Sequence, residues 1–147
     1  MALSPVVVFA ASVAINLIFK LLTPKFGGFR RGIDTVLFCS VYIGYTAGSY
    51  QGALYGILIA ITYYVFRSTG WVYSVFVIPI NGFIGYLAGI FAGMDLMILG
   101  NLLFVVYHAL TFIVVGIILR RAELKYLAFI VFNYISTIVL LRIALLL

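Results

Sequence analysis

The sequence predicts an all-α integral membrane protein: a compact bundle of about six transmembrane helices in a single domain over residues 1–147. Composition is the first observation behind this prediction. Hydrophobic residues make up 67% of the chain and charged residues only 8%, with a mean hydropathy of +1.32. A soluble domain needs far more polar surface. The second observation is that the apolar runs are close to the roughly 20 residues that cross a bilayer. The lipid bilayer is therefore the first expected partner.

Each expected helix is bounded by a change in composition. Pro5 stands in the first turn of the first helix, where its missing N–H is harmless. The loop at 23–32 combines Pro, paired Gly and basic residues. The stretch 33–66 is too long for one span, so we divide it near Ser49–Gln51; one long tilted helix is the alternative. The expected helices span residues 4–22, 33–49, 51–66, 72–92, 95–119 and 126–147.

A glycine-rich pattern, Ile-Gly-Tyr-x-Ala-Gly-x-x-x-Gly, occurs twice, at residues 43–52 and 84–93, 41 positions apart. On a helix, glycines spaced by four leave a stripe without side chains, and a neighbouring backbone can pack closely against it. The repeat reflects either duplication of a helical hairpin or the composition of glycine-rich membrane helices. The expected glycine-zipper contact positions are Gly44, Gly48, Gly52, Gly56, Gly85, Gly89 and Gly93.

The first helix carries two different stripes. Ala10 and Ala14 form a small-x-x-x-small pair, and Ser12, Asn16 and Lys20 form a polar stripe on another side. A helix with both features is expected to touch protein on two sides. We therefore expect the two alanines to make helix or subunit contacts, which makes other membrane subunits expected partners.

Residues suited to catalysis are scarce. Asp34, Asp95 and Glu123 all fall at expected membrane interfaces, so no carboxylate pair is placed for acid–base chemistry. One His and one Cys do not make a metal or haem site, and no phosphate-binding motif is present. We expect a protein that is not an enzyme and holds no cofactor or metal. The net charge of +6 lies in clusters between apolar runs, which is typical of membrane orientation rather than nucleic-acid binding.

Uncharged polar residues gather near mid-membrane in the second half of the chain. Polar groups in hydrocarbon carry a desolvation cost, so they are expected to face one another, a cavity or a ligand. Interhelical hydrogen bonds in a packed bundle would satisfy them; a pocket for a small-molecule ligand is the alternative. We expect His108 to lie within hydrogen-bond reach of Asn81 or Asn133. The candidate ligand-binding residues are Asn81, Asn101, His108, Thr111, Asn133 and Thr137.

These features resemble the substrate-binding S-components of energy-coupling-factor vitamin transporters. The resemblance lies in six short helices, the Ala10-x-x-x-Ala14 pair, and the run Arg31-Gly32-Ile33-Asp34 that leads into the glycines. In that family the alanine motif contacts the transmembrane coupling subunit, and helices 4 to 6 with their loops hold the vitamin. The chain is shorter than typical members. The resemblance implies coupling roles for Ala10 and Ala14, and a pocket lined by Asn81, Asn101, His108 and Asn133.

The basic residues predict an orientation. Eight of the nine follow the first, third and fifth expected helices, and the turns after the second and fourth contain none. Because Lys and Arg in short loops stay in the cytoplasm, these three loops are expected to be cytoplasmic and both termini external. Members of the S-component family keep their termini inside, so the charges and the resemblance disagree. The eight residues are Lys20, Lys25, Arg30, Arg31, Arg67, Arg120, Arg121 and Lys125.

Two classes of function remain. The first is a small-molecule-binding subunit of a multi-subunit membrane transporter, with a polar pocket among helices 4 to 6. The second is a non-catalytic structural or assembly subunit of a larger membrane protein complex. The first class requires a pocket that a ligand can enter, whereas the second requires only the glycine and alanine contact faces.

Overall fold

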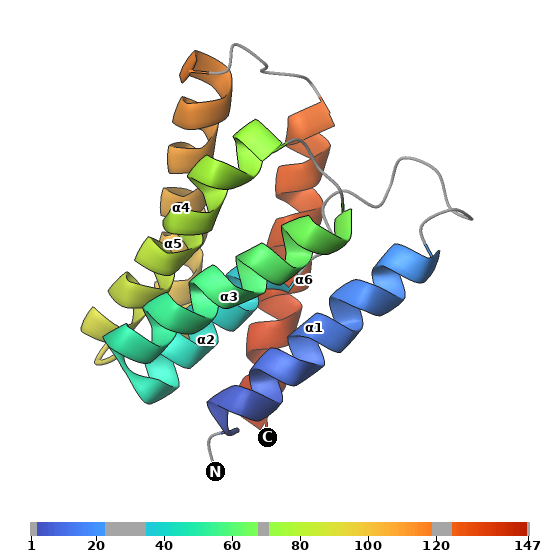
Figure 1. Ribbon diagram of the computed structural model, residues 1–147. Helices are drawn as coiled ribbons and strands as arrows, with labels where there is room; N and C mark the ends of the chain where they lie inside the picture. The colour runs from blue at the N-terminus through green and yellow to red at the C-terminus, as the bar shows by residue number, and fades with distance from the viewer. Residues whose placement is uncertain (1–2, 23–34, 68–70, 119–124, 147) are drawn as a thin grey trace.

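The computed structural model describes residues 3–22, 35–67, 71–118 and 125–146, and these residues form six α-helices and no strand (Figure 1). The all-helical, six-helix part of the prediction is therefore confirmed. The basic loop at 23–32 lies outside the described residues. In chain order, the helices are α1 (Pro5–Leu22), α2 (Val36–Ala47), α3 (Ser49–Arg67), α4 (Trp71–Ile90), α5 (Leu96–Phe112), which continues as the π-helical segment η3 (Ile113–Ile118), and α6 (Lys125–Leu146).

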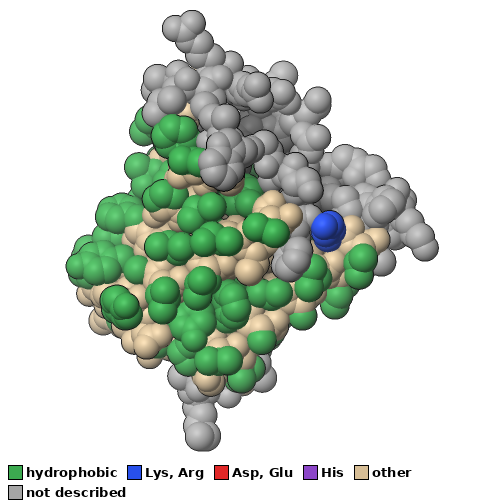
Figure 2. Space-filling view, viewed as in Figure 1, with side chains coloured by type: hydrophobic (Ala, Val, Ile, Leu, Met, Phe, Trp, Pro, Cys, Tyr) green, Lys and Arg blue, Asp and Glu red, His purple; other side chains and the backbone are tan. Residues whose placement is uncertain are grey.

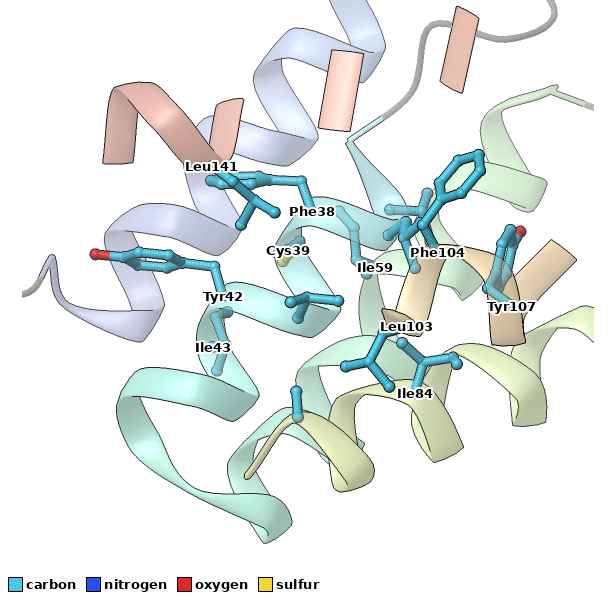
Figure 3. Packing of buried hydrophobic residues seen from close by; sticks show 14 of the residues in the cluster. Phe38, Cys39, Tyr42, Ile43, Ile59, Ile84, Leu103, Phe104, Tyr107 and Leu141 are labelled. Carbon is cyan, nitrogen blue, oxygen red and sulfur yellow. The ribbon is translucent and has the colours of Figure 1, made fainter. Parts of the chain in front are cut away.

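The short helix α2 lies at the centre of the bundle. It has 12 residues, and those from Val36 to Gly44 are all buried. A helix that is apolar on every side is stable only when other elements surround it. Figure 3 shows α2 among core side chains that come from the four following helices, including Ile59, Ile84, Leu103 and Leu141. The core is thus built around α2.

A single residue separates α2 from α3. Gly48 has φ 99° and ψ 169°, a backbone conformation that is essentially restricted to glycine, and its N–H donates to the carbonyl of Gly44. The chain therefore turns at Gly48 and not at Ser49–Gln51, and α3 already begins at Ser49. The alternative of one long tilted helix is wrong.

The two copies of the glycine pattern pack against each other. A Cβ atom added at Gly44 or at Gly52 would overlap the carbonyl oxygen of Gly85 on α4, and one added at Gly85 would overlap the carbonyl oxygen of Gly52. The obstacles are backbone atoms, which cannot rotate away as a side chain can. The repeat is therefore the contact between α4 and the α2–α3 hairpin.

The remaining expected glycine positions divide into two kinds. Gly56 and Gly89 also lie against backbone, at α4 and at the start of α3 respectively. Gly48 and Gly93 do not: the space that a Cβ would occupy there is open within the chain. Their assignment to the contact stripe needs correction, because Gly48 forms the turn just described and Gly93 lies in the turn after α4.

Two hydrogen bonds connect α1 to the residue before α2. The Thr35 N–H donates to Asn16 Oδ1 at 3.1 Å, and Thr35 Oγ1 donates to the carbonyl of Ser12 at 3.0 Å. The N–H groups at a helix start have no partner within the helix, so Asn16 completes the start of α2 from outside it. Ser12 and Asn16 of the polar stripe thus face α2, whereas Lys20 at its end is exposed, and Ala10 and Ala14 lie exposed on another side.

One helical stretch in the described part of the chain is long and apolar enough to cross a membrane, judged by length and composition. It comprises 18 residues of α6, with a mean hydropathy of 2.1. Hydrophobic side chains are spread over the whole described surface on the face drawn in Figure 2, and basic atoms show only as a small spot at its edge. Shorter apolar stretches, of 10 to 17 residues, are Pro5–Leu21, Val36–Ala47, Ser74–Ile90 and Leu96–Phe112.

Candidate functional site

The start of α5 is set by Asp95. Its carboxylate accepts hydrogen bonds from the backbone N–H groups of Met97 at 2.9 Å and Ile98 at 3.1 Å. Such an N-cap satisfies donors that the helix itself leaves free, and it fixes where the helix begins. Asp95 therefore has a structural role that accounts for its position, and it sets the register of the polar residues further along α5.

The helices α5 and α6 run antiparallel, and their contacts define a common register. His108 on α5 contacts Asn133 on α6. Nearer the start of α5, the Leu141 side chain of α6 packs against Gly100, and its Cδ1 lies where a Cβ of residue 100 would be. Residue numbers thus fall along α5 as they rise along α6. We call this contact region the α5–α6 seam.

A buried His–Asn pair lies at the middle of the seam. The ring nitrogen Nε2 of His108 and the amide oxygen Oδ1 of Asn133 are 3.3 Å apart, and the two residues are 6% and 1% exposed. In the tautomer with the proton on Nε2, His108 donates and Asn133 accepts. The sequence predicts Asn81 or Asn133 as the partner of His108, and in the structure the partner is Asn133.

Aromatic rings enclose the imidazole of His108. Its centroid lies 4.3 Å from that of Phe104, 5.0 Å from that of Tyr107 and 5.8 Å from that of Phe129. Rings on three sides limit the rotation of the imidazole and keep its hydrogen bond in an apolar surrounding, where such bonds are stronger than in water. These rings are not among the residues predicted from the sequence, although the spacing of Phe104 and Tyr107, four and one residues before His108, could have indicated them.

Two threonine hydroxyls flank the pair without a partner. The Oγ1 atoms of Thr111 and Thr137 are buried and make no hydrogen bond within the described part of the chain, and both residues are 0% exposed. Thr111 lies one turn beyond His108 on α5, and Thr137 lies one turn beyond Asn133 on α6. The structure therefore brings four of the six candidate residues together along the seam.

Asn81 occupies a different part of the bundle. Its Nδ2 donates to the carbonyl of Val77 at 2.9 Å, and its own carbonyl lies against Gly56 of α3. Its Oδ1 is buried without a partner, and no hydrogen bond in the described part of the chain joins it to His108. The expectation that Asn81 pairs with His108 is not met, because Asn81 faces the glycine contact between α3 and α4.

Asn101 lies on the outer side of the seam. Its Nδ2 donates to the carbonyl of Met97 at 2.7 Å, and its Oδ1 accepts from the hydroxyl of Tyr134 at 2.8 Å. Tyr134 is 40% exposed, so this bond joins α5 to α6 at the surface of the protein. Tyr134 is not among the residues predicted from the sequence; the signal for it is a phenol hydroxyl in an apolar helix, which needs a polar partner.

In the described ranges, no group of three or more His, Cys, Asp or Glu residues could hold a metal ion. The candidate site therefore offers hydrogen bonds and aromatic surface as its chemistry. Comparison of the chain with protein-family models, with curated proteins and with solved structures returned no match.

Proposed function

We propose that the chain is the small-molecule-binding subunit of a multi-subunit membrane transporter, and that its ligand binds at the polar residues between α5 and α6. The observation that carries the proposal is the buried His108–Asn133 pair with an unpartnered hydroxyl on each side. An unpaired buried polar group costs about 1–3 kcal/mol, and a ligand that pairs with it removes that cost. A bundle that only had to pack would be more stable with apolar side chains at Thr111 and Thr137.

The distribution of apolar surface supports a multi-pass location in the membrane. Large hydrophobic side chains are exposed on five of the six helices, all but the central α2, among them Val7, Val65, Phe83, Val105 and Val131. Contiguous apolar surface of this kind is rare on soluble monomers. The helical backbone that α5 and η3 form together, from Leu96 to Ile118, rises by roughly 30 Å, about the thickness of the hydrocarbon core. The resemblance to S-components agrees with both points.

The test is purification from the native membrane followed by mass spectrometry of co-purifying small molecules, with His108→Ala beside the wild type. Under the proposal, His108→Ala removes most of the co-purifying ligand, while the melting temperature falls only modestly. Tyr134→Phe is the matched control, because it deletes the outer bond to Asn101 and leaves the buried pair intact. A wild type that carries no small molecule, or a His108→Ala variant that retains it, contradicts the proposal.

A structural or assembly subunit is the second candidate, and the surface of α1 favours it. Ala10 and Ala14 are exposed, and Val7 and Ile18 on the same side are each 54% exposed. A partner helix that covers this face would explain small residues flanked by large ones. Ala14→Leu is expected to release co-purifying subunits without lowering the melting temperature of the isolated chain. Loss of subunits in that variant, with no small molecule in the wild type, favours this second function.

A further inference from the structure

The hydroxyls of Thr111 and Thr137 differ in their hydrogen bonding from four other helical Ser and Thr hydroxyls in the described part of the chain. A Ser or Thr in a helix ordinarily donates to a carbonyl three or four residues earlier. Thr111 and Thr137 make no such bond, although both are fully buried. Four other hydroxyls in the chain do make it, at 2.8 to 3.0 Å: those of Ser40, Thr46, Thr62 and Ser136.

Thr137 lies beside a hydroxyl that does make such a bond. The carbonyl of Asn133, four residues before Thr137, accepts the hydroxyl of Ser136 at 3.0 Å. The Thr137 hydroxyl makes no hydrogen bond in the described part of the chain. Thr111 and Thr137 thus present two buried hydroxyls to the seam, one on each side of the His108–Asn133 pair.

The spacing of the two hydroxyls follows from the antiparallel register. Thr111 lies three residues beyond His108 in one direction, and Thr137 lies four residues beyond Asn133 in the other. At the rise of an α-helix, this places them about 10 Å apart along the seam. One small group cannot reach both hydroxyls, so a molecule that bonds to both must be extended.

The stretch of the seam between the two hydroxyls offers no charge to a ligand. Residues 96–118 of α5 and η3 and residues 126–141 of α6 contain no Asp, Glu, Lys or Arg; the two basic residues of α6, Lys125 and Arg142, lie beyond this stretch at either end. A charged group buried there would lack a counter-charge, which is strongly unfavourable. Between the hydroxyls, His108 and Asn133 already bond to each other, and the rings of Phe104 and Tyr107 beside His108 suit an apolar middle of the ligand.

We infer that the α5–α6 seam binds an uncharged, extended molecule with an apolar middle and a hydrogen-bonding group near each end, and that Thr111 and Thr137 recognise the two ends. This inference rests on the proposed small-molecule binding. Entry requires α6 to move aside, and α6 is suited to that, because only 17% of its apolar stretch is buried inside the bundle.

The test uses 1,8-octanediol as the probe and 1-octanol as the matched probe with one hydroxyl. Melting is followed through Cys39, the only cysteine in the sequence, whose buried thiol becomes reactive to a fluorogenic maleimide on unfolding. For the wild type, the melting temperature with the diol at ten times the Kd of the diol is expected to be roughly 3–6 °C higher than the melting temperature with 1-octanol at the same concentration.

The variant Thr111→Val/Thr137→Val is expected to lose this difference between the probes, and each single variant to lose part of it. Valine matches the shape of threonine and removes only the hydroxyl, so the double variant itself melts at or above the wild-type temperature. Thr62→Val is the matched control, because its hydroxyl bonds to its own helix at the Ile59 carbonyl, and it retains the difference.

An equal response to both probes in the wild type overturns the inference, as does a difference that survives in the double variant. The outcome is separable from that of the proposed function. If native small molecules co-purify and are lost in His108→Ala, but the diol raises the melting temperature no more than 1-octanol does, only the inference about the two threonines is rejected. If the diol raises the melting temperature more than 1-octanol in a Thr-dependent way, but no native small molecule co-purifies, the inference about the seam is retained and the transporter function is rejected.

Discussion

Gly85 is required at its position because of packing, and its backbone conformation does not demand glycine. A Cβ at this residue would overlap the carbonyl oxygen of Gly52. Gly85→Ala is therefore expected to lower the free energy of unfolding by about 1–3 kcal/mol, since the helices must separate to admit it. Gly93→Ala is the control, because its Cβ enters open space, and it is expected to change stability by less than about 0.5 kcal/mol. Chemical unfolding in detergent micelles measures both; equal losses would argue against the close contact.

The His108–Asn133 pair can be tested by a double-mutant cycle. His108→Leu and Asn133→Leu each remove one partner of a buried hydrogen bond and leave the other partner unpaired, at a cost of about 1–3 kcal/mol. The double variant lacks both polar groups, so its loss is expected to be smaller than the sum of the single losses by about 0.5–3 kcal/mol. Strictly additive losses in thermal or chemical unfolding would mean that the two side chains do not interact.

At the scale of elements, the turn between α2 and α3 depends on one backbone conformation. Gly48 has φ 99°, and a side chain there is strained, although the space around it is open. Gly48→Ala is expected to destabilise the protein by about 1–3 kcal/mol, and Gly48→Leu by about the same amount. At Gly85, leucine is expected to be much worse than alanine. A marked size dependence at position 48 in melting experiments would show that packing, and not conformation, selects this glycine.

The shortness of α2 is compatible with a membrane bundle. A helix of 12 residues rises by about 18 Å, well below the roughly 30 Å of the hydrocarbon core. Backbone that ends at membrane depth is tolerated where protein surrounds it and satisfies its polar groups. Both conditions apply to α2, because its residues are buried and the Thr35 N–H at its start donates to Asn16 of α1.

At the scale of the whole molecule, the basic residues predict that both termini face outward. The experiment places single cysteines at Ser4 and at Gly28, the latter outside the described residues, in a Cys39→Ala background. A membrane-impermeant thiol reagent added to intact cells is expected to label position 4 and spare position 28. Labelling of position 28 alone would reverse the orientation and agree with the arrangement of the S-component family; labelling of neither in cells, but of both after lysis, would place both on the cytoplasmic side.

Local patterns in the sequence were sufficient for the helical class and for the approximate extent of the helices. Hydrophobic composition and the positions of Pro and Gly affect only the nearest one or two helical turns, so they are sufficient to locate a helix such as α1 without knowledge of its neighbours. The same patterns identified the glycine repeat, and five of the seven glycines expected at helix contacts lie against backbone atoms of a neighbouring helix. The turn within 33–66 was also expected, because one helix of that length would exceed the bilayer.

Only the tertiary structure decided which residues of each pattern meet. Gly48 and Gly52 fit the same four-residue spacing, yet only Gly52 packs, because the chain turns at Gly48 and the helical periodicity restarts in α3. Asn81 and Asn133 were equal partners for His108 by sequence. The antiparallel register of α5 and α6 brings Asn133 to it, whereas the glycine contact turns Asn81 toward α3. Such choices depend on how helices distant in the chain are placed, and spacing within one helix carries no information about that.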